Sequence, residues 1–262
     1  MSGALYLVPV PIGDGDPMDE LAPRIPRIVA GIRDFVVENE RSARRFLCRV
    51  MPQEALDASS FGVLDEHTRP EDVRALLAPL LAGRDAAILS EAGSPCVADP
   101  GAALVAEAAA AGIRVVPLPG PSSILMAVMA SGLGGQRFAF SGYLPPDQAG
   151  REAALRGLEA DSRRHGSTQA FIETPYRNDA VAASAAAVLA PDTVFCAAVG
   201  LSTPEERVVR MTAADWRARP ERIGKTPTVF LLSAAGVGRG EPTGKRDAPP
   251  RDRAAGRRGR GS

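Results

Sequence analysis

The chain has 262 residues, of which 45% are hydrophobic and only 5% aromatic, so it is long enough for two compact α/β domains with cores of small and branched side chains. Lys and Arg together number 31 and so do Asp and Glu, so the overall charge excludes no class of partner. Three scattered cysteines exclude a disulfide framework and a zinc site, and the lack of a leader or of an apolar run of about 18 residues leads us to expect a soluble cytoplasmic protein without a membrane partner.

Apolar strand-like runs alternate with helix-like stretches along the chain, which is typical of parallel α/β units. The pattern in the first part predicts strands at 4–9, 34–38, 85–90 and 113–118, and helices at 19–31, 42–50, 71–81 and 102–111. The later pattern predicts strands at 138–144, 169–173, 193–199, 207–211 and 228–232, and helices at 122–131, 151–161, 178–189 and near Trp216. We therefore predict an N-terminal α/β domain over residues 1–118 and a C-terminal α/β domain over residues 119–235.

The last part of the sequence, residues 236–262, differs in composition from the rest. It carries seven Arg and one Lys against three acidic residues, so the preceding residues have five more negative than positive charges. A segment with so few apolar side chains cannot bury enough surface to offset its ordering entropy, and we expect a disordered basic tail. Contact of its arginines with RNA is one interpretation, and a solvated tail without a partner is the other.

Three loops follow predicted strands at the position where ligands bind in parallel sheets, namely the carboxyl ends of the strands. They cover residues 9–17, 90–101 and 117–123, and all are rich in Gly and Pro. None has the glycine spacing of a dinucleotide fingerprint or a phosphate-binding loop. Loop 9–17 is a ligand loop or a plain turn.

Individual side chains in these loops have more than one possible role. We expect Glu91 to contact a ligand because it sits at a strand tip. Asp99 is expected to cap the helix that begins near Gly101, with ligand contact as the alternative. Ser122 can cap the following helix, whose free N–H groups would then face the cleft.

Together these segments resemble the tetrapyrrole methylase superfamily, and within it the 16S ribosomal RNA ribose 2′-O-methyltransferases. The resemblance rests first on AGSPCVADPG at 92–101 and VVPLPGPSS at 115–123, which follow LYLVPVPIG at 5–13. Shorter matches are SGYLP at 141–145, IETPYR at 172–177 and TPTVFLL at 226–232, so the likeness extends over about residues 4–233.

The resemblance implies two α/β domains with S-adenosyl-L-methionine bound in a folded pose in the cleft between them. It also implies a homodimer and no metal. Carried over by position, the residues that would contact the cofactor are Ile12, Glu91, Gly93, Ser94, Ser122, Ser123, Ile172, Gly200 and Pro227.

The chain departs from the ribosomal enzymes at three places. Their usual acid-acid-Thr-Arg run is here Glu38-Asn39-Glu40-Arg41, they usually have Asp in place of Glu91, and the segment 200–207 differs from their pattern. The resemblance therefore supports the binding of the cofactor more strongly than the identity of the substrate.

Methyl transfer to a ribose hydroxyl requires a base near the hydroxyl as it loses its proton. Glu38, at the end of the second strand, is the candidate base, and Arg41 is suited to a backbone phosphate. Glu173 and Arg177 are a candidate substrate-binding pair from the other domain. A structural ion pair or a solvated surface is the alternative for all four, and Tyr143 and Tyr176 either stack on a base or only pack.

Three functions remain open at this point. The first is methylation of RNA, at a ribose 2′-hydroxyl of ribosomal RNA. The second is methylation of a small molecule such as a tetrapyrrole, which the acidic charge of residues 1–235 favours mildly because RNA binding usually wants a basic face. The third is a non-catalytic module that binds the cofactor.

Overall fold

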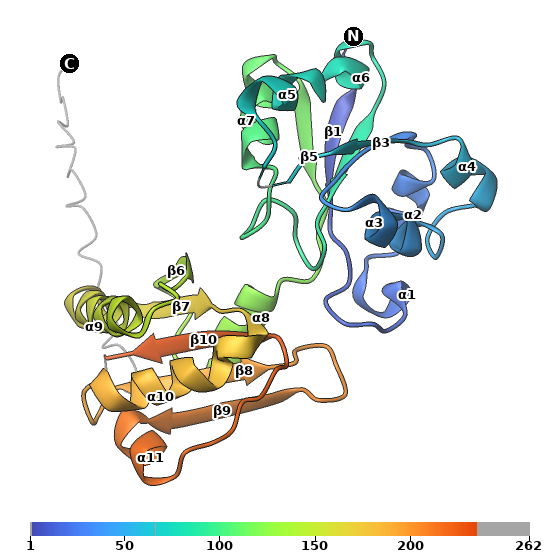
Figure 1. Ribbon diagram of the computed structural model, residues 1–262. Helices are drawn as coiled ribbons and strands as arrows, with labels where there is room; N and C mark the ends of the chain where they lie inside the picture. Colours follow the sequence, from blue (N-terminus) through green and yellow to red (C-terminus); the bar gives the residue numbers. More distant parts are fainter. Residues whose placement is uncertain (1, 66, 235–262) are drawn as a thin grey trace, which may run out of the picture.

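The computed structural model describes residues 2–65 and 67–234, which form two β-sheets in separate lobes (Figure 1). Both sheets are covered by helices, so the predicted α/β class is confirmed. The tail predicted over residues 236–262 lies outside the described residues. Within the described ranges, no helix is long and apolar enough to cross a membrane.

The first sheet consists of five parallel strands in the order β3-β2-β4-β1-β5. The strands are β1 (Ala4–Val8), β2 (Asp34–Val37), β3 (Ser60–Val63), β4 (Ala86–Leu89) and β5 (Arg114–Pro117). The central strand β4 is apolar and buried throughout, because helices cover both faces of the sheet. Since all the strands are parallel, their carboxyl ends lie at one edge, and the three predicted ligand loops leave from that edge.

Helices pack on both faces of the first sheet. They are α1 (Pro17–Glu20), α2 (Arg24–Val29), α3 (Glu40–Leu47), α4 (Gln53–Asp57), α5 (Pro70–Ala75), α6 (Ala78–Leu81) and α7 (Ala102–Ala110). Alternate side chains of β2 point to opposite faces: Phe35 packs with residues of α2, α3 and α4, whereas Val36 packs with residues of α5, α6 and α7. The lobe therefore has a core on each side of its sheet.

The second sheet is mixed, in the order β6-β7-β10-β8-β9. The strands are β6 (Phe138–Tyr143), β7 (Thr168–Ile172), β8 (Val194–Val199), β9 (Arg207–Thr212) and β10 (Thr228–Ser233). Only β6 and β7 pair in parallel, so the expectation of parallel units throughout was wrong. Seven residues join β8 to β9, and a parallel crossover needs about a dozen or more, so these two strands form an antiparallel hairpin.

Helices also sandwich the second sheet. They are α8 (Ser123–Ser131), α9 (Gln148–His165), α10 (Asn178–Val188) and α11 (Ala213–Ala218), with a short 3-10 turn at Pro175–Arg177. Helix α8 packs on the face that carries Ala198 and Val229, and the other helices pack on the face that carries Phe195 and Phe230. The predicted boundary between residues 118 and 119 falls in the connection from β5 to α8 and stays a prediction.

Several predicted elements differ from the observed ones for local reasons. The helix expected over 19–31 is two short helices because Leu21 is extended. The helix expected over 71–81 is interrupted between α5 and α6, where Pro79 has no N–H to continue the hydrogen-bond ladder. Helix α4 and edge strand β3 were missed, since β3 is short, partly exposed and contains Gly62.

An aromatic cluster forms the centre of the second lobe and gives a stability test. The ring of Phe230 stacks on Phe171 and Phe195, with centroids 5.6 and 5.7 Å away. We expect Phe230→Ala to lower the free energy of unfolding of this lobe by about 3–5 kcal/mol, because it leaves a cavity. Trp216 is the only tryptophan in the chain and packs edge-on against Phe195, so its fluorescence during denaturant unfolding reports this lobe.

The control is Phe138→Ala, which removes the same ring from the edge strand β6, where the side chain is 39% exposed. Its effect should be clearly smaller. Equal losses for the two variants would show that the stacked cluster is not the centre of stability.

Candidate active site

The three loops at the carboxyl edge of the first sheet are joined to one another. Val10 and Gly93 exchange backbone hydrogen bonds of 2.9 and 3.1 Å, which connect the first loop to the second. The hydroxyl of Ser94 donates to the carbonyl oxygen of Pro121 at 3.0 Å, which connects the second to the third. A Cβ atom on Gly120 would lie 2.2 Å from the ring of Pro9, so the third loop also packs closely on the first. The loops therefore form one rigid platform.

The first loop also meets the second lobe. A Cβ atom on Gly13 would lie 2.3 Å from the carbonyl oxygen of Ser202, which only a glycine permits without movement. Ser202 is in the turn after β8 and has a φ of 62°, and Gly200 in the same turn has a φ of 59°. The two lobes thus come into close contact where the first loop meets the sharp turn after β8.

A cavity of about 340 Å³ lies beside this contact, with walls from both lobes. Its lining combines aliphatic side chains, prolines, hydroxyl side chains, a tyrosine and one carboxylate. The lining residues are Ile12, Ala92, Ser123, Tyr143, Ile172, Glu173, Pro175, Ala198, Gly200, Leu201, Thr203, Pro227, Thr228 and Val229. A mostly apolar cavity with a few convergent polar groups is the usual form of a small-molecule site.

Seven residues singled out from the sequence line this cavity. Five belong to the expected cofactor set, one to the expected substrate pair and one is a candidate stacking tyrosine: Ile12, Ser123, Ile172, Gly200, Pro227, Glu173 and Tyr143. They come from segments more than 200 residues apart in the chain. The structure therefore brings expected site residues from the N-terminal and the C-terminal parts of the chain to one cavity.

Four other expected cofactor residues do not line the cavity and instead hold the loops that do. Gly93 and Ser94 make the bonds between loops described above. Glu91 is exposed, and its carboxylate accepts a hydrogen bond from the hydroxyl of Ser42 in α3. Ser122 caps α8, as expected, by accepting from the amide of Leu125. Their binding of a cofactor stays a prediction.

Other lining residues were not anticipated. Ala92 lies in a loop already singled out, so its position was within reach of sequence reasoning. Ala198 and Val229 are ordinary apolar residues of buried strands and carry no sequence signal that separates them from the core. Pro175 and Thr228 lie in the segments 172–177 and 226–232, which carry the family resemblance, but their side chains do not by themselves indicate a binding site.

Glu173 is the one carboxylate in the cavity wall, and its side chain is fully buried. One oxygen, Oε1, accepts from the amide of Thr174 at 2.7 Å and from the guanidinium of Arg177, and this second bond raises the pKa of Arg177. The other oxygen, Oε2, has no hydrogen-bond partner among the described residues. A buried acceptor without a partner costs about 1–3 kcal/mol, so this oxygen is suited to a donor that enters the cavity.

Three carboxylates lie close together at the carboxyl ends of β2 and β4. Burial, together with the negative charges of Glu38 and Glu91, raises the pKa of Asp99 to about 6. Asp99 does not cap α7, because the N-cap residue is Gly101 and no side chain bonds there, so the capping expectation was wrong. Arg41 is exposed in the first turn of α3, three residues after Glu38. The expected catalytic pair therefore borders the platform without lining the cavity.

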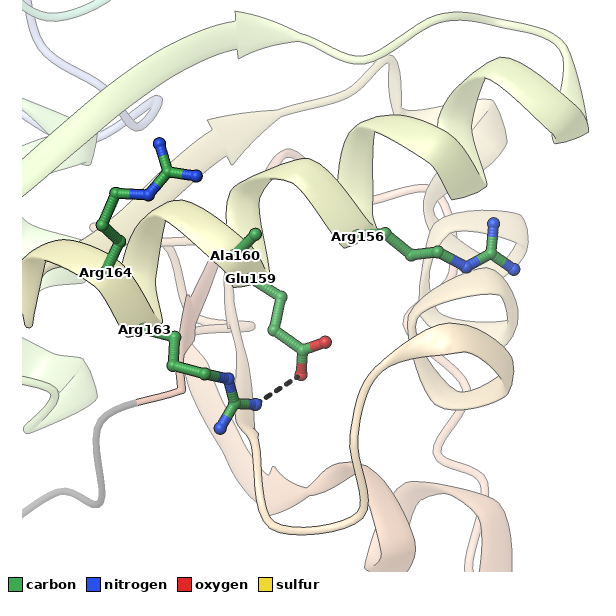
Figure 2. A pocket seen from close by; sticks show the side chains of 5 residues that line it. All are labelled: Arg156, Glu159, Ala160, Arg163 and Arg164. Carbon is green, nitrogen blue, oxygen red and sulfur yellow. Dashed lines mark ion pairs between the residues drawn. The ribbon is translucent and has the colours of Figure 1, made fainter.

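A second pocket, of about 330 Å³, lies on α9 far from the platform loops in sequence, and Figure 2 shows its charged lining. Arg163 approaches Glu159 at 3.8 Å. Glu159 also accepts from the amide of Ala190 at 2.8 Å and from the hydroxyl of Thr193, so it fixes the turn before β8. Glu159 therefore has a structural role in this pocket.

The sequence matches the family model described as Tetrapyrrole (Corrin/Porphyrin) Methylases over residues 4–216. A protein of Pseudomonas aeruginosa named Ribosomal RNA small subunit methyltransferase I is 35% identical over 176 residues, which is 67% of this chain and 58% of that protein. A protein of the same name from Micromonospora olivasterospora is 36% identical over 218 residues, 83% of this chain and 66% of that protein. The chain thus spans less than two thirds of the length of these relatives.

Two solved structures share the fold. The methyltransferase CobJ superposes with a TM-score of 0.60 at 21% identity, over 88% of this chain and 94% of that one. Uroporphyrin-III C-methyl transferase from Thermus thermophilus complexed with S-adenyl homocysteine gives a TM-score of 0.51 at 20% identity, over 89% of this chain and 98% of that one. At this level of identity the likeness concerns the arrangement of the two α/β lobes.

The raised pKa of Asp99 predicts a pH-dependent stability. Its pKa is about 6 in the folded chain against an ordinary value of 3.8, so the folded state binds the proton more tightly. Stability is therefore lost as the pH rises from about 4 to about 6, and Asp99→Asn should remove this loss. We expect Asp99→Asn to unfold at a higher temperature than the parent protein at pH 7, and the difference to vanish below pH 4.

A companion variant separates the causes of this shift. Glu38→Gln removes one of the two neighbouring negative charges and should lower the pKa of Asp99, measured by NMR titration of the carboxyl carbons. An Asp99 pKa that is the same in Glu38→Gln as in the parent protein would show that the two carboxylates do not interact.

Proposed function

The chain belongs to the tetrapyrrole (corrin/porphyrin) methylase family, and from this premise we propose that it transfers a methyl group from S-adenosyl-L-methionine to a ribose 2′-hydroxyl of ribosomal RNA. The observation that carries the proposal is the cavity shared by the two lobes, in which a buried carboxylate oxygen lacks a partner. The names of the relatives support ribosomal RNA as the acceptor. We also propose that the reaction takes place in the cytoplasm, as expected from the sequence.

The residues of the cavity suit the cofactor. Aliphatic walls from Ile12, Ile172 and Leu201 can bury its apolar parts, and the hydroxyl of Ser123 supplies hydrogen bonding. Glu91, Gly93, Ser94 and Ser122 contribute by fixing the loops that carry the lining residues. When bound, S-adenosyl-L-methionine supplies an electrophilic methyl group.

The chain's own residues must orient the acceptor hydroxyl and remove its proton. In the proposal Glu38 accepts that proton, and Arg41 binds a neighbouring phosphate through its planar guanidinium. Glu173 and Arg177 bind the substrate, with Oε2 of Glu173 accepting a hydrogen bond from it. The platform aligns donor and acceptor and keeps water out, which is the larger part of catalysis for an in-line methyl displacement.

We also propose that two copies of the chain pair as a homodimer. Helix α8 covers one face of the second sheet, yet it leaves Leu125 and Met129 exposed at 52% and 80%. These two side chains are four residues apart and therefore lie on the same face of the helix. A second copy that covers this face would bury them.

Mass spectrometry of ribosomal RNA from cells with and without the gene tests the function. We expect the loss of one 2′-O-methyl group from the small-subunit RNA when the gene is deleted, and its return when the gene is restored. Restoration with Glu38→Gln should fail, whereas restoration with Glu40→Gln, a neighbouring carboxylate that pairs with Arg44, should succeed. An unchanged modification pattern would refute RNA as the acceptor and favour a small-molecule substrate.

Cofactor binding gives a separate prediction. Ala92 is exposed and lines the cavity, so Ala92→Trp places an indole in the cavity without changing the core. We expect at least a tenfold loss of affinity for S-adenosylhomocysteine by calorimetry, which is about 1.4 kcal/mol. Ala109→Trp on the exposed face of α7 is the control and should bind as the parent protein does. Unchanged affinity in Ala92→Trp would remove this cavity from consideration as the cofactor site.

A further inference from the structure

An exposed tyrosine and an exposed lysine form a pair at the rim of the cavity. The side chain of Tyr176 is 81% exposed, and the ammonium nitrogen of Lys225 lies 5.1 Å from the centre of its ring. Tyr176 directly follows Pro175, and Lys225 comes two residues before Pro227; both prolines line the cavity. The sequence left open whether Tyr176 packs or stacks, and its exposure excludes a role in the core.

Buried hydrogen bonds hold this pair in place. Asn178 is fully buried, and its Nδ2 donates to the carbonyl oxygens of Gly224 at 3.1 Å and Thr226 at 2.8 Å, on either side of Lys225. The carboxylate of Asp179 accepts from the amides of Ile223 at 2.7 Å and Gly224 at 3.0 Å. The segment that carries Lys225 is thus fastened to the turn that carries Tyr176.

The surroundings of the pair add a second ring and a second cation. Tyr143 lines the cavity and is 57% exposed. Arg177, next to Tyr176, has a buried Nε atom without a partner. Lys225 makes no ion pair with any described residue. A ligand that fits this rim has a flat ring to stack on tyrosine and a negative charge for the ammonium group, and an unpaired nucleotide has both.

We propose that Tyr176 and Lys225 form a stacking site for the base of an unpaired nucleotide, with Lys225 contacting the adjacent phosphate. This inference rests on the proposed function and adds to it the class of substrate. The acceptor strand is single-stranded or locally opened RNA, because a base within a duplex cannot expose its face to Tyr176. Asn178 is a positioning residue that keeps the pair at the edge of the cavity.

The test is RNA binding by the full-length protein with S-adenosylhomocysteine present. The probe is a fluorescein-labelled RNA strand of mixed sequence, about sixteen nucleotides long, used alone and annealed to its complement, with anisotropy as the readout. We expect the parent protein to bind the single strand at least tenfold more tightly than the duplex. Tyr176→Ala should weaken binding of the single strand about tenfold or more, and Tyr176→Phe, which keeps the ring, should stay within about twofold.

The charge of Lys225 is tested against a neighbouring cation. Lys225→Ala should weaken binding and reduce the slope of log affinity against log salt by about one, as expected when one phosphate contact is lost. Arg222→Ala is the matched control, because Arg222 is 90% exposed in the same segment and lies 3.9 Å from Asp179. Its effect should be below about twofold. All the variants should keep the affinity for S-adenosylhomocysteine and the melting temperature of the parent protein.

Equal affinity of the parent protein for single strand and duplex would overturn the inference, and so would unchanged binding of the single strand by Tyr176→Ala. Binding of a tetrapyrrole but not of RNA, weakened by Tyr176→Ala, would also reject it and assign the rim to a macrocycle. Failure of the proposed function gives a different result. Absence of S-adenosylhomocysteine binding would refute the cofactor. A Tyr176-dependent preference for single-stranded RNA would still support the stacking site in that case.

Discussion

The site depends on the mutual locking of three loops at one edge of a parallel sheet. A parallel sheet delivers all its carboxyl ends to the same edge, but loops alone would leave the lining residues poorly placed. Here the backbone pairing of Val10 with Gly93, the bond from Ser94 to Pro121 and the packing of Gly120 on Pro9 remove that freedom. A site held in this way needs little reorganisation when a ligand binds, which is the condition for aligning two reactants.

The second lobe contributes a different kind of surface. Its mixed sheet presents apolar side chains of β8 and β10 to the cavity and places Glu173 in the wall, half satisfied by Arg177. A buried carboxylate is destabilised when one of its oxygens accepts no hydrogen bond. The second lobe therefore favours a ligand that donates a hydrogen bond from a hydroxyl or amine group. The first lobe thus contributes a rigid platform, and the second lobe contributes the wall that selects the ligand by its hydrogen-bond donors.

Much of this arrangement could be predicted from the sequence, and the failures have physical causes. Loops rich in Gly and Pro after apolar runs indicated the platform. Ile12 and Ser123, which were assigned through the family resemblance, line one cavity together with Glu173. Ala198 was out of reach because a strand residue that faces a cavity looks the same as one that faces the core. The antiparallel pairing of β8 with β9 was within reach, because only seven residues separate these strands, whereas strand patterning does not encode the direction of β10 relative to β7 and β8. Asn178 gave no signal, since its role depends on carbonyl groups nearly fifty residues away.

The third loop has a mechanical consequence beyond its place in the platform. Among the described residues the backbone passes from one lobe to the other only between β5 and α8, and this connection includes Pro121, which accepts the bond from Ser94. Any rotation of the lobes apart therefore pulls directly on the second loop. Widening the cavity to admit or release a molecule therefore strains the bond between Ser94 and Pro121, so the opening of the cavity and the order of the platform oppose each other.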